Sequence, residues 1–235
     1  MKIIHYLYAI LTILLLMLLP SCTLTEDDTE DQLYGAAGTF STLGTVIMNG
    51  ENLFIESDLY GTLTPENPET ITSIDADSTG QRILAGFIFL TNPNARTAIE
   101  NRPVRIVDFL YKVQTLPASD LRDAGEDIFG NSPLQISDVT LSKNHLNIQY
   151  SYKGSAQHPH RFNLVLTSQS TIDANGLLPV EFRHDACNDS SGQTMESIVS
   201  FTLESIPECQ LPGFKGFRII YNSGANSQAE WKAFK

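Results

Sequence analysis

The sequence predicts an all-β protein in which a small closed barrel is followed by a two-sheet β-sandwich, behind an N-terminal signal peptide. Apolar and β-branched residues alternate with a period of two in most of the chain, and no segment sustains the 3.6-residue period of a helix. Turn residues such as Asn49-Gly50 and Asn175-Gly176 separate these runs. An apolar run also opens the chain and ends just before Cys22, as an export signal does.

The first half of the chain contains the expected barrel strands. Asn49-Gly50 joins the first two as a hairpin, and Leu116-Pro117 ends the last. Gly61 to Pro68 is expected to be a turn-rich connection. Four or five strands over roughly 85 residues, mostly meandering, suit a small closed barrel. The expected strands are 39–48, 53–57, 81–90 and 104–115.

Residues 116–132 differ in composition from the strands around them and contain the predicted domain boundary. Ser119 is the expected N-cap of one or two helical turns that reach Asp127, and Asn131-Ser132-Pro133 ends them. We therefore assign residues 33–117 to the barrel domain and residues 118–235 to the sandwich domain.

The second half of the chain predicts seven strands at intervals of about ten residues, which is typical of a β-sandwich. Residues 146–152 alternate without interruption, so one face of that strand should be buried. Trp231 and Phe234 are expected to hold the C-terminus on the core. The expected strands are 134–141, 146–152, 162–166, 180–184, 198–203, 217–221 and 230–234.

The N-terminus has the form of a lipoprotein signal peptide over residues 1–21. Lys2 supplies a short positive region, and residues 10–19 form an apolar core. Leu19, Ser21 and Cys22 match the lipobox of bacterial lipoproteins, in which the cysteine thiol takes a diacylglycerol; Pro20 departs from its usual pattern. The alternative is an uncleaved helix over 3–19, which is near the lower limit of spanning length. Either interpretation places the body of the protein outside the cytoplasm, because Lys2, the only nearby cation, is N-terminal to the apolar run.

An acidic tether, residues 22–32, follows the lipobox. Its charges make it a solvated, self-repelling spacer. Acidic residues at this place resemble the surface-export signal of Bacteroidetes lipoproteins, so we expect a cell-envelope protein of the outer membrane that faces the outside of the cell. The charged residues are Glu26, Asp27, Asp28, Glu30 and Asp31.

Net charge argues against nucleic acid as a partner. The chain has 15 Lys+Arg and 27 Asp+Glu, and residues 1–21 contain only Lys2, so the mature protein carries 14 cations against 27 anions, a net charge of −13. An acidic body repels polyanions, and no basic cluster interrupts it.

Cys187 and Cys209 are the cysteines that remain after Cys22, and an exported pair favours a disulfide. If 180–186 and 196–204 were consecutive antiparallel strands, the two thiols would lie at opposite ends, about 25 Å apart. A disulfide requires Cα atoms within about 7 Å. A returning loop over 205–214 could close that gap, so both outcomes remain open.

Three further patterns each have a plainer alternative. Asp77-Ser78-Thr79 resembles an O-glycosylation sequon of exported Bacteroidetes proteins, with Ser78 as the acceptor, but it also fits an ordinary turn. His158-Pro159-His160 has no visible third metal ligand and fits a polar loop. Tyr150, Tyr152 and Phe162 would suit a sugar-stacking platform, although such alternation is more common in a core.

The order of several motifs resembles the NigD-like lipoproteins of Bacteroidetes. The resemblance covers nearly the whole chain and implies an N-terminal OB-type barrel and a C-terminal β-sandwich. The family takes its name from a bacteriocin operon and defines no catalytic residues, and Cys187 and Cys209 are not part of its pattern. The matching motifs are Gly38 to Val46, Gly80 to Leu84, Ile128 to Ile136, Leu146 to Tyr152, Val180 to Ala186 and Val199 to Leu203.

The sequence contains no catalytic motif, phosphate loop or dinucleotide fingerprint. We therefore expect no enzyme, metal or cofactor, and a lipid-anchored binding or accessory module whose partner is an envelope protein or a glycan. One alternative is a bacteriocin immunity-type protein, which the family name suggests. Another is a hydrolase whose carboxylates the fold brings together.

The lipid anchor can be tested by replacing Cys22 with alanine. The variant should lose acylation and leave the membrane fraction, because the thiol is the only expected attachment point. Metabolic labelling with a fatty acid and membrane fractionation measure the two effects. A variant that stays in the membrane fraction would favour the uncleaved helix.

Overall fold

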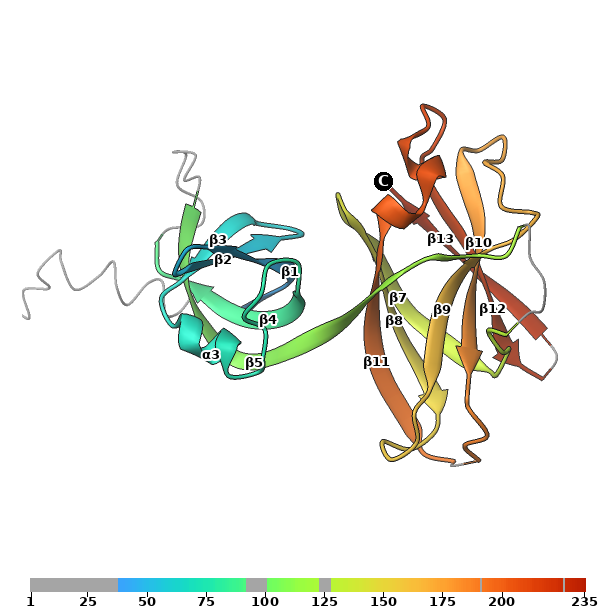
Figure 1. Ribbon diagram of the computed structural model, residues 1–235, viewed down its shortest axis with the longest axis horizontal. Helices are drawn as coiled ribbons and strands as arrows, with labels where there is room; N and C mark the ends of the chain where they lie inside the picture. Colours follow the sequence, from blue (N-terminus) through green and yellow to red (C-terminus); the bar gives the residue numbers. More distant parts are fainter. Residues whose placement is uncertain (1–37, 92–100, 123–127, 191, 226) are drawn as a thin grey trace, which may run out of the picture. The chain divides into compact units, whose positions relative to one another are not determined.

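The computed structural model describes residues 38–91, 101–122, 128–190, 192–225 and 227–235 (Figure 1). The chain from Thr39 to Lys235 forms one compact unit. The predicted signal peptide and acidic tether, including Cys22, lie outside the described residues. Among the helices of the described ranges, none has the length and apolar character needed to cross a membrane.

Five strands close into the predicted barrel. They pair in the order β3-β2-β1-β4-β5, and a parallel pairing of β3 with β5 completes the ring. Closure leaves these strands without a long open edge within the ring. The elements are β1 (Phe40–Asn49), β2 (Asn52–Ser57), β3 (Gly61–Pro65), α3 (Pro68–Thr72), β4 (Arg82–Phe89) and β5 (Asn101–Pro117).

Alternating apolar side chains fill the barrel. Val46, Ile55 and Leu63, one from each of the first three strands, are completely buried. Phe87 and Phe89 on β4 pack edge-to-face, with ring centroids 5.1 Å apart, an arrangement that adds roughly 0.5–1.5 kcal/mol to the burial of the rings. The barrel therefore has a core of its own.

Two facing sheets form the predicted sandwich around a second core. Strands β11, β8 and β7 make one side, and a five-stranded sheet in the order β13-β12-β10-β9-β6 makes the other. The elements are β6 (Ser119–Asp120), β7 (Leu134–Leu141), β8 (His145–Lys153), β9 (Arg161–Leu166), β10 (Leu177–Asp185), β11 (Thr194–Thr202), η1 (Leu203–Ser205), η2 (Pro207–Gln210), β12 (Gly216–Gly224) and β13 (Ser227–Phe234).

Strand β5 belongs to both halves of the fold. It pairs with β4 through Val113 in the barrel, and its last residues, Gln114 to Pro117, pair in parallel with Val199 to Thr202 of β11. Hydrogen bonding therefore continues from the barrel into one sheet of the sandwich, which gives a single eight-stranded sheet (Figure 1).

Three expectations about local structure are wrong. The segment Gly61 to Pro68 was expected to be a turn-rich connection. It contains strand β3 and the start of α3, because Leu63 packs into the barrel core. Ser119 is extended and pairs with Val165 of β9, so it is not a helix N-cap; residues 123–127 of the expected helical turns lie outside the described residues. Phe234 is 63 % exposed, and its neighbour Ala233 is buried instead, because the alternation of β13 turns Phe234 outward.

Cys187 and Cys209 are free thiols in the structure, which is one of the two outcomes that the sequence left open. The premise that their preceding strands are neighbours in one sheet is wrong, since β10 and β11 lie in different sheets. Cys209 is buried in the sandwich core, and burial raises the pKa of its thiol to about 12. Cys187 follows β10 and accepts a hydrogen bond from Arg161 over 3.4 Å.

Gly216 offers a test of the close contact at the start of β12. A Cβ atom there would lie 2.0 Å from the carbonyl oxygen of Ala233, whereas one at Gly213 would meet nothing within 4 Å. Gly216→Ala should therefore lower the free energy of unfolding by about 1–3 kcal/mol or more, and Gly213→Ala should change it little. Urea denaturation compares them, and equal effects would contradict the packing described.

Candidate functional site

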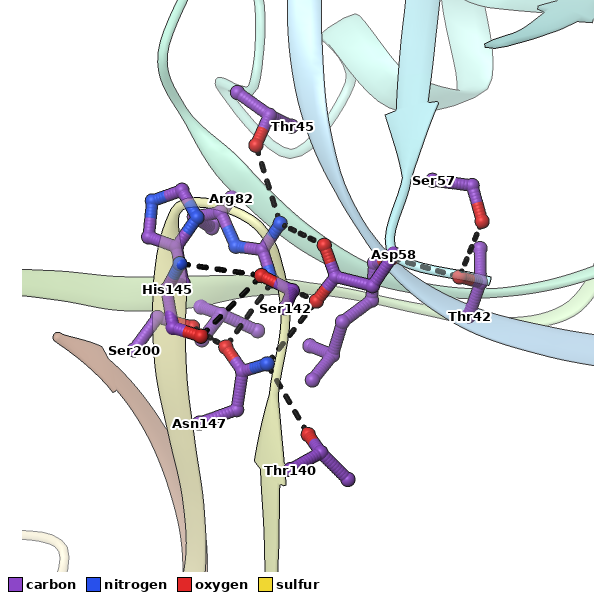
Figure 2. Close-up of polar contacts among 12 residues, drawn as sticks. Thr42, Thr45, Ser57, Asp58, Arg82, Thr140, Ser142, His145, Asn147 and Ser200 are labelled. Carbon is purple, nitrogen blue, oxygen red and sulfur yellow. Dashed lines mark hydrogen bonds and ion pairs between the residues drawn. The ribbon is translucent and has the colours of Figure 1, made fainter. Parts of the chain in front are cut away.

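A buried polar cluster lies where the barrel meets the outer face of the sandwich. We call it the junction network; it consists of Asp58, Arg82, Asn147 and Ser200 (Figure 2). Asp58 follows β2 and Arg82 opens β4, so the barrel supplies the charged pair. Asn147 and Ser200 are cross-strand partners on β8 and β11. The sandwich therefore supplies only neutral groups.

The charged pair has fork geometry. Arg82 donates from Nη1 to Oδ1 of Asp58 over 2.8 Å and from Nη2 to Oδ2 over 2.6 Å. A third bond, of 3.1 Å, runs from Nη1 to the hydroxyl of Thr45. The Arg82 side chain is fully buried and that of Asp58 is 14 % exposed. Two parallel charge-assisted bonds of this kind are among the stronger polar contacts in proteins.

Asn147 connects this pair to the sandwich. Its amide oxygen accepts from Nη2 of Arg82 over 3.1 Å and from the hydroxyl of Ser200 over 2.7 Å. Its amide nitrogen donates to Oδ2 of Asp58 over 3.0 Å and to Thr140 over 3.1 Å. Each polar atom of the Asn147 side chain thus has two partners, one of them in the barrel.

The junction network has an unfavourable as well as a favourable contribution to the free energy of folding. Nε of Arg82 is buried and has no hydrogen-bond partner among the described residues, and taking both charges out of water costs several kcal/mol per ion. The nearby His145 is buried, and this burial, with the positive charge of Arg82, lowers its pKa to about 4. The cluster therefore fixes a specific arrangement of barrel and sandwich more than it adds net stability.

Next to the network lies a small hollow of about 220 Å³, which we call the junction pocket. Asp58 and Asp138 both line it, so one cleft contains two carboxyl groups. Both oxygens of Asp58 already accept hydrogen bonds from the network. The hydrogen-bonding capacity of this carboxylate is therefore used largely within the fold.

A larger open hollow of about 750 Å³, the sheet groove, adjoins the junction pocket. Leu84, Gln149 and Ile198 line both hollows. On the same face of β8 the buried Asn147 is followed by Gln149, which is exposed, and by the half-buried Ser151. The barrel covers one end of this polar face and leaves the other open. The remaining lining residues are Tyr111, Lys112, Gln114, Ser137, Tyr150, Glu196 and Ser197.

A separate histidine cluster lies at the end of the sandwich and holds its loops together. His160 shares hydrogen bonds with His184 over 2.8 Å and with Asp189 over 3.2 Å, and His184 with the carbonyl of Pro133 over 3.2 Å. Burial lowers the pKa of His184. In the described ranges, no three or more His, Cys, Asp or Glu side chains form a metal site.

The structure places the sequence-predicted candidates at separate positions. Ser78 is exposed in the turn before β4, where its amide donates to the side chain of Gln81 over 2.9 Å. Tyr150 and Phe162 lie in the sandwich core, where their rings pack 4.5 Å apart. The plainer alternative, core packing, holds for both.

Sequence reasoning missed the residues that line the junction. Arg82 carried one signal, because it is the lone cation in the otherwise apolar run 82–90. Asp58 follows an apolar strand in a turn, where aspartate is common, and carried none. The alternation of residues 146–152 correctly placed Gln149 on an open face, but it also placed Asn147 there.

Residues 117–232 match the family model of the NigD-like C-terminal beta sandwich domain, which confirms the resemblance expected from the sequence. No curated protein matches the chain.

Solved structures from Bacteroides species share the fold. A protein of unknown function from Bacteroides vulgatus is 19 % identical, with a TM-score of 0.67 over 84 % of this chain and 91 % of that one. A NigD-like immunity protein from Bacteroides caccae is 18 % identical, with a TM-score of 0.59 over 82 % and 91 %. A putative lipoprotein from Bacteroides fragilis is 9 % identical, with a TM-score of 0.60 over 84 % and 98 %. At these identities the likeness establishes the fold alone.

Removal of the buried cation tests the junction network. Arg82→Met should lower the free energy of unfolding by about 3–5 kcal/mol, because Asp58 would lose its compensating charge. Arg105→Met is the matched control, since its pair with Glu66 is 50 % and 49 % exposed and contributes about 0–1 kcal/mol. Urea denaturation measures both, and a small loss for Arg82→Met would contradict the description.

His145 predicts an acid-sensitive stability. Its pKa is lowered in the folded state to about 4, so its contribution is complete above its unfolded pKa of about 6.5 and is lost as the pH falls from there towards 4. The loss is at most about 3 kcal/mol. His145→Gln should flatten this part of the stability curve. Denaturation from pH 8 to pH 4 compares the variant with the wild-type protein, and an unchanged pH dependence would contradict the prediction.

Proposed function

We propose that this chain, whose residues 117–232 form a NigD-like C-terminal β-sandwich domain, is a lipid-anchored protein of the bacterial cell envelope and acts as a non-catalytic binding module. The sheet groove is its binding surface. The lipid on Cys22 and the acidic tether hold this surface away from the outer membrane, on the outside of the cell. No enzymatic step is needed for this role.

The observation that carries the proposal is the contrast between the junction network and the sheet groove. In the junction network the charged groups bind one another, so they hold the fold together. In the sheet groove the side chains of Gln114, Gln149 and Glu196 are exposed. Its volume of about 750 Å³ falls in the range of roughly 300–1,000 Å³ that ligand sites occupy. Polar groups there are available to a partner.

Site-specific crosslinking tests whether the groove is a binding surface. A photo-crosslinking amino acid at Gln114, expressed in the full chain in intact producing cells, should form one defined adduct that mass spectrometry identifies. The control carries the same amino acid at Leu211, which is 52 % exposed and does not line the groove. Equal labelling at both positions, or none at Gln114, would argue against the groove as the binding surface.

A bacteriocin immunity role is the second candidate. It is favoured by the structural likeness to the NigD-like immunity protein from Bacteroides caccae. If this role is correct, deletion of the gene should make the producing strain sensitive to a bacteriocin made by its own operon, and the full chain should restore resistance. Unchanged sensitivity after deletion would reject it.

A hydrolase is the third candidate, because the junction pocket contains Asp58 and Asp138. Asp138→Asn should abolish any glycosidase or esterase turnover that the wild-type chain shows, since it leaves the network intact. We expect no turnover from either protein. Turnover that is lost in the variant would replace the non-catalytic proposal.

A further inference from the structure

We propose that the sheet groove recognises a neutral oligosaccharide, with the exposed ring of Tyr111 as its stacking platform. This inference rests on the proposed binding function and names the class of ligand. Strand β5 provides this platform, whereas the rings of Tyr150 and Phe162 belong to the sandwich core.

The platform is an aromatic side chain that the fold holds outward. Tyr111 is 60 % exposed, and its ring stacks on that of Phe109, with centroids 6.0 Å apart and planes inclined by 20°. Phe109 in turn lies against Gly86, where a Cβ atom would come within 3.3 Å of its ring. The flat face of an aromatic ring is complementary to the apolar C–H face of a sugar ring.

A bulge in the barrel lies next to Phe109 and Tyr111. The register between β4 and β5 shifts between Ala85 and Phe87, and Asp108 on the opposite strand has a φ of +69°. Bulges bend a strand and redirect the side chains beside them. The irregularity therefore immediately precedes Phe109 and Tyr111 and accompanies their outward placement.

Amides and hydroxyls line the same groove as this ring. Gln114 and Gln149 are exposed, and neither side-chain amide has a hydrogen bond with another described residue. Ser137 and Ser151 add hydroxyls to the same lining. An amide both donates and accepts hydrogen bonds, as each sugar hydroxyl does, so this lining matches a ligand that is rich in hydroxyl groups.

Charge selects a neutral ligand. The lining contains one cation, Lys112, and one anion, Glu196. Nζ of Lys112 already donates to the carbonyl oxygen of Asp75 over 2.6 Å. The whole chain carries a net charge of −12, which repels uronate, sulfate or phosphate groups on a glycan.

The side chains favour a saccharide over an extended peptide. A peptide added to a sheet gains specificity from apolar pockets for its alternate side chains. Only Leu84 and Ile198 offer aliphatic surface in the lining, and both are half-buried. A peptide ligand is therefore an outcome that the test must separate from a glycan.

A glycan array followed by calorimetry tests the inference. The probe is full-length protein in a detergent without a sugar headgroup, applied to neutral and anionic oligosaccharides. We expect binding to neutral members. Tyr111→Ala should weaken the affinity about three- to tenfold, and Tyr111→Phe should retain it. Phe234→Ala, at a residue 63 % exposed outside the groove, is the control and should bind as wild type.

The outcomes separate this inference from the proposed function. Preference for anionic glycans, or equal losses in Tyr111→Ala and Phe234→Ala, would overturn the inference. No glycan binding together with a defined protein adduct at Gln114 in cells would overturn it and leave the binding function standing. Neither glycan binding nor an adduct would overturn both.

Discussion

The ion pair between Asp58 and Arg82 is the interaction on which the junction of the two β units depends. A fully buried arginine is unusual, because the charge loses its hydration, and here two oxygens of one carboxylate replace much of it. Asn147 then completes the arrangement from the sandwich side. With both ions in the barrel, the sandwich contributes only neutral groups, Asn147 and Ser200, to the junction network.

The same face of β8 has two different environments. At Asn147 the barrel covers it and every polar atom of that side chain has partners, whereas at Gln149 it opens to solvent. One strand thus passes from a structural polar contact to a candidate recognition surface within two residues. Because β5 is shared, the position of Tyr111 relative to that surface is set by the same sheet that carries the network.

Much of the fold could be predicted from alternation and turn residues, including the barrel, the sandwich and most strand positions. Strand β3 was not predicted, because Leu63 is the only apolar side chain between Gly61 and Pro65 and one residue makes no pattern.

The junction network was not predicted for a different reason. Alternation tells which face of β8 a side chain occupies but not what covers that face, so the burial of Asn147 depends on a tertiary contact with residues about 65 to 90 positions earlier in the chain.

The shared strand β5 also has a consequence for the order of folding as the chain is synthesised. The last barrel strand ends at Pro117, so the ring can close before the sandwich strands have been made. The pairing of Gln114 to Pro117 with β11 then waits until residue 202 has been made, and such distant pairings form slowly. For that interval the end of β5 and the Asp58–Arg82 pair are uncovered, so the finished barrel acts as the template on which the later sheet is laid down.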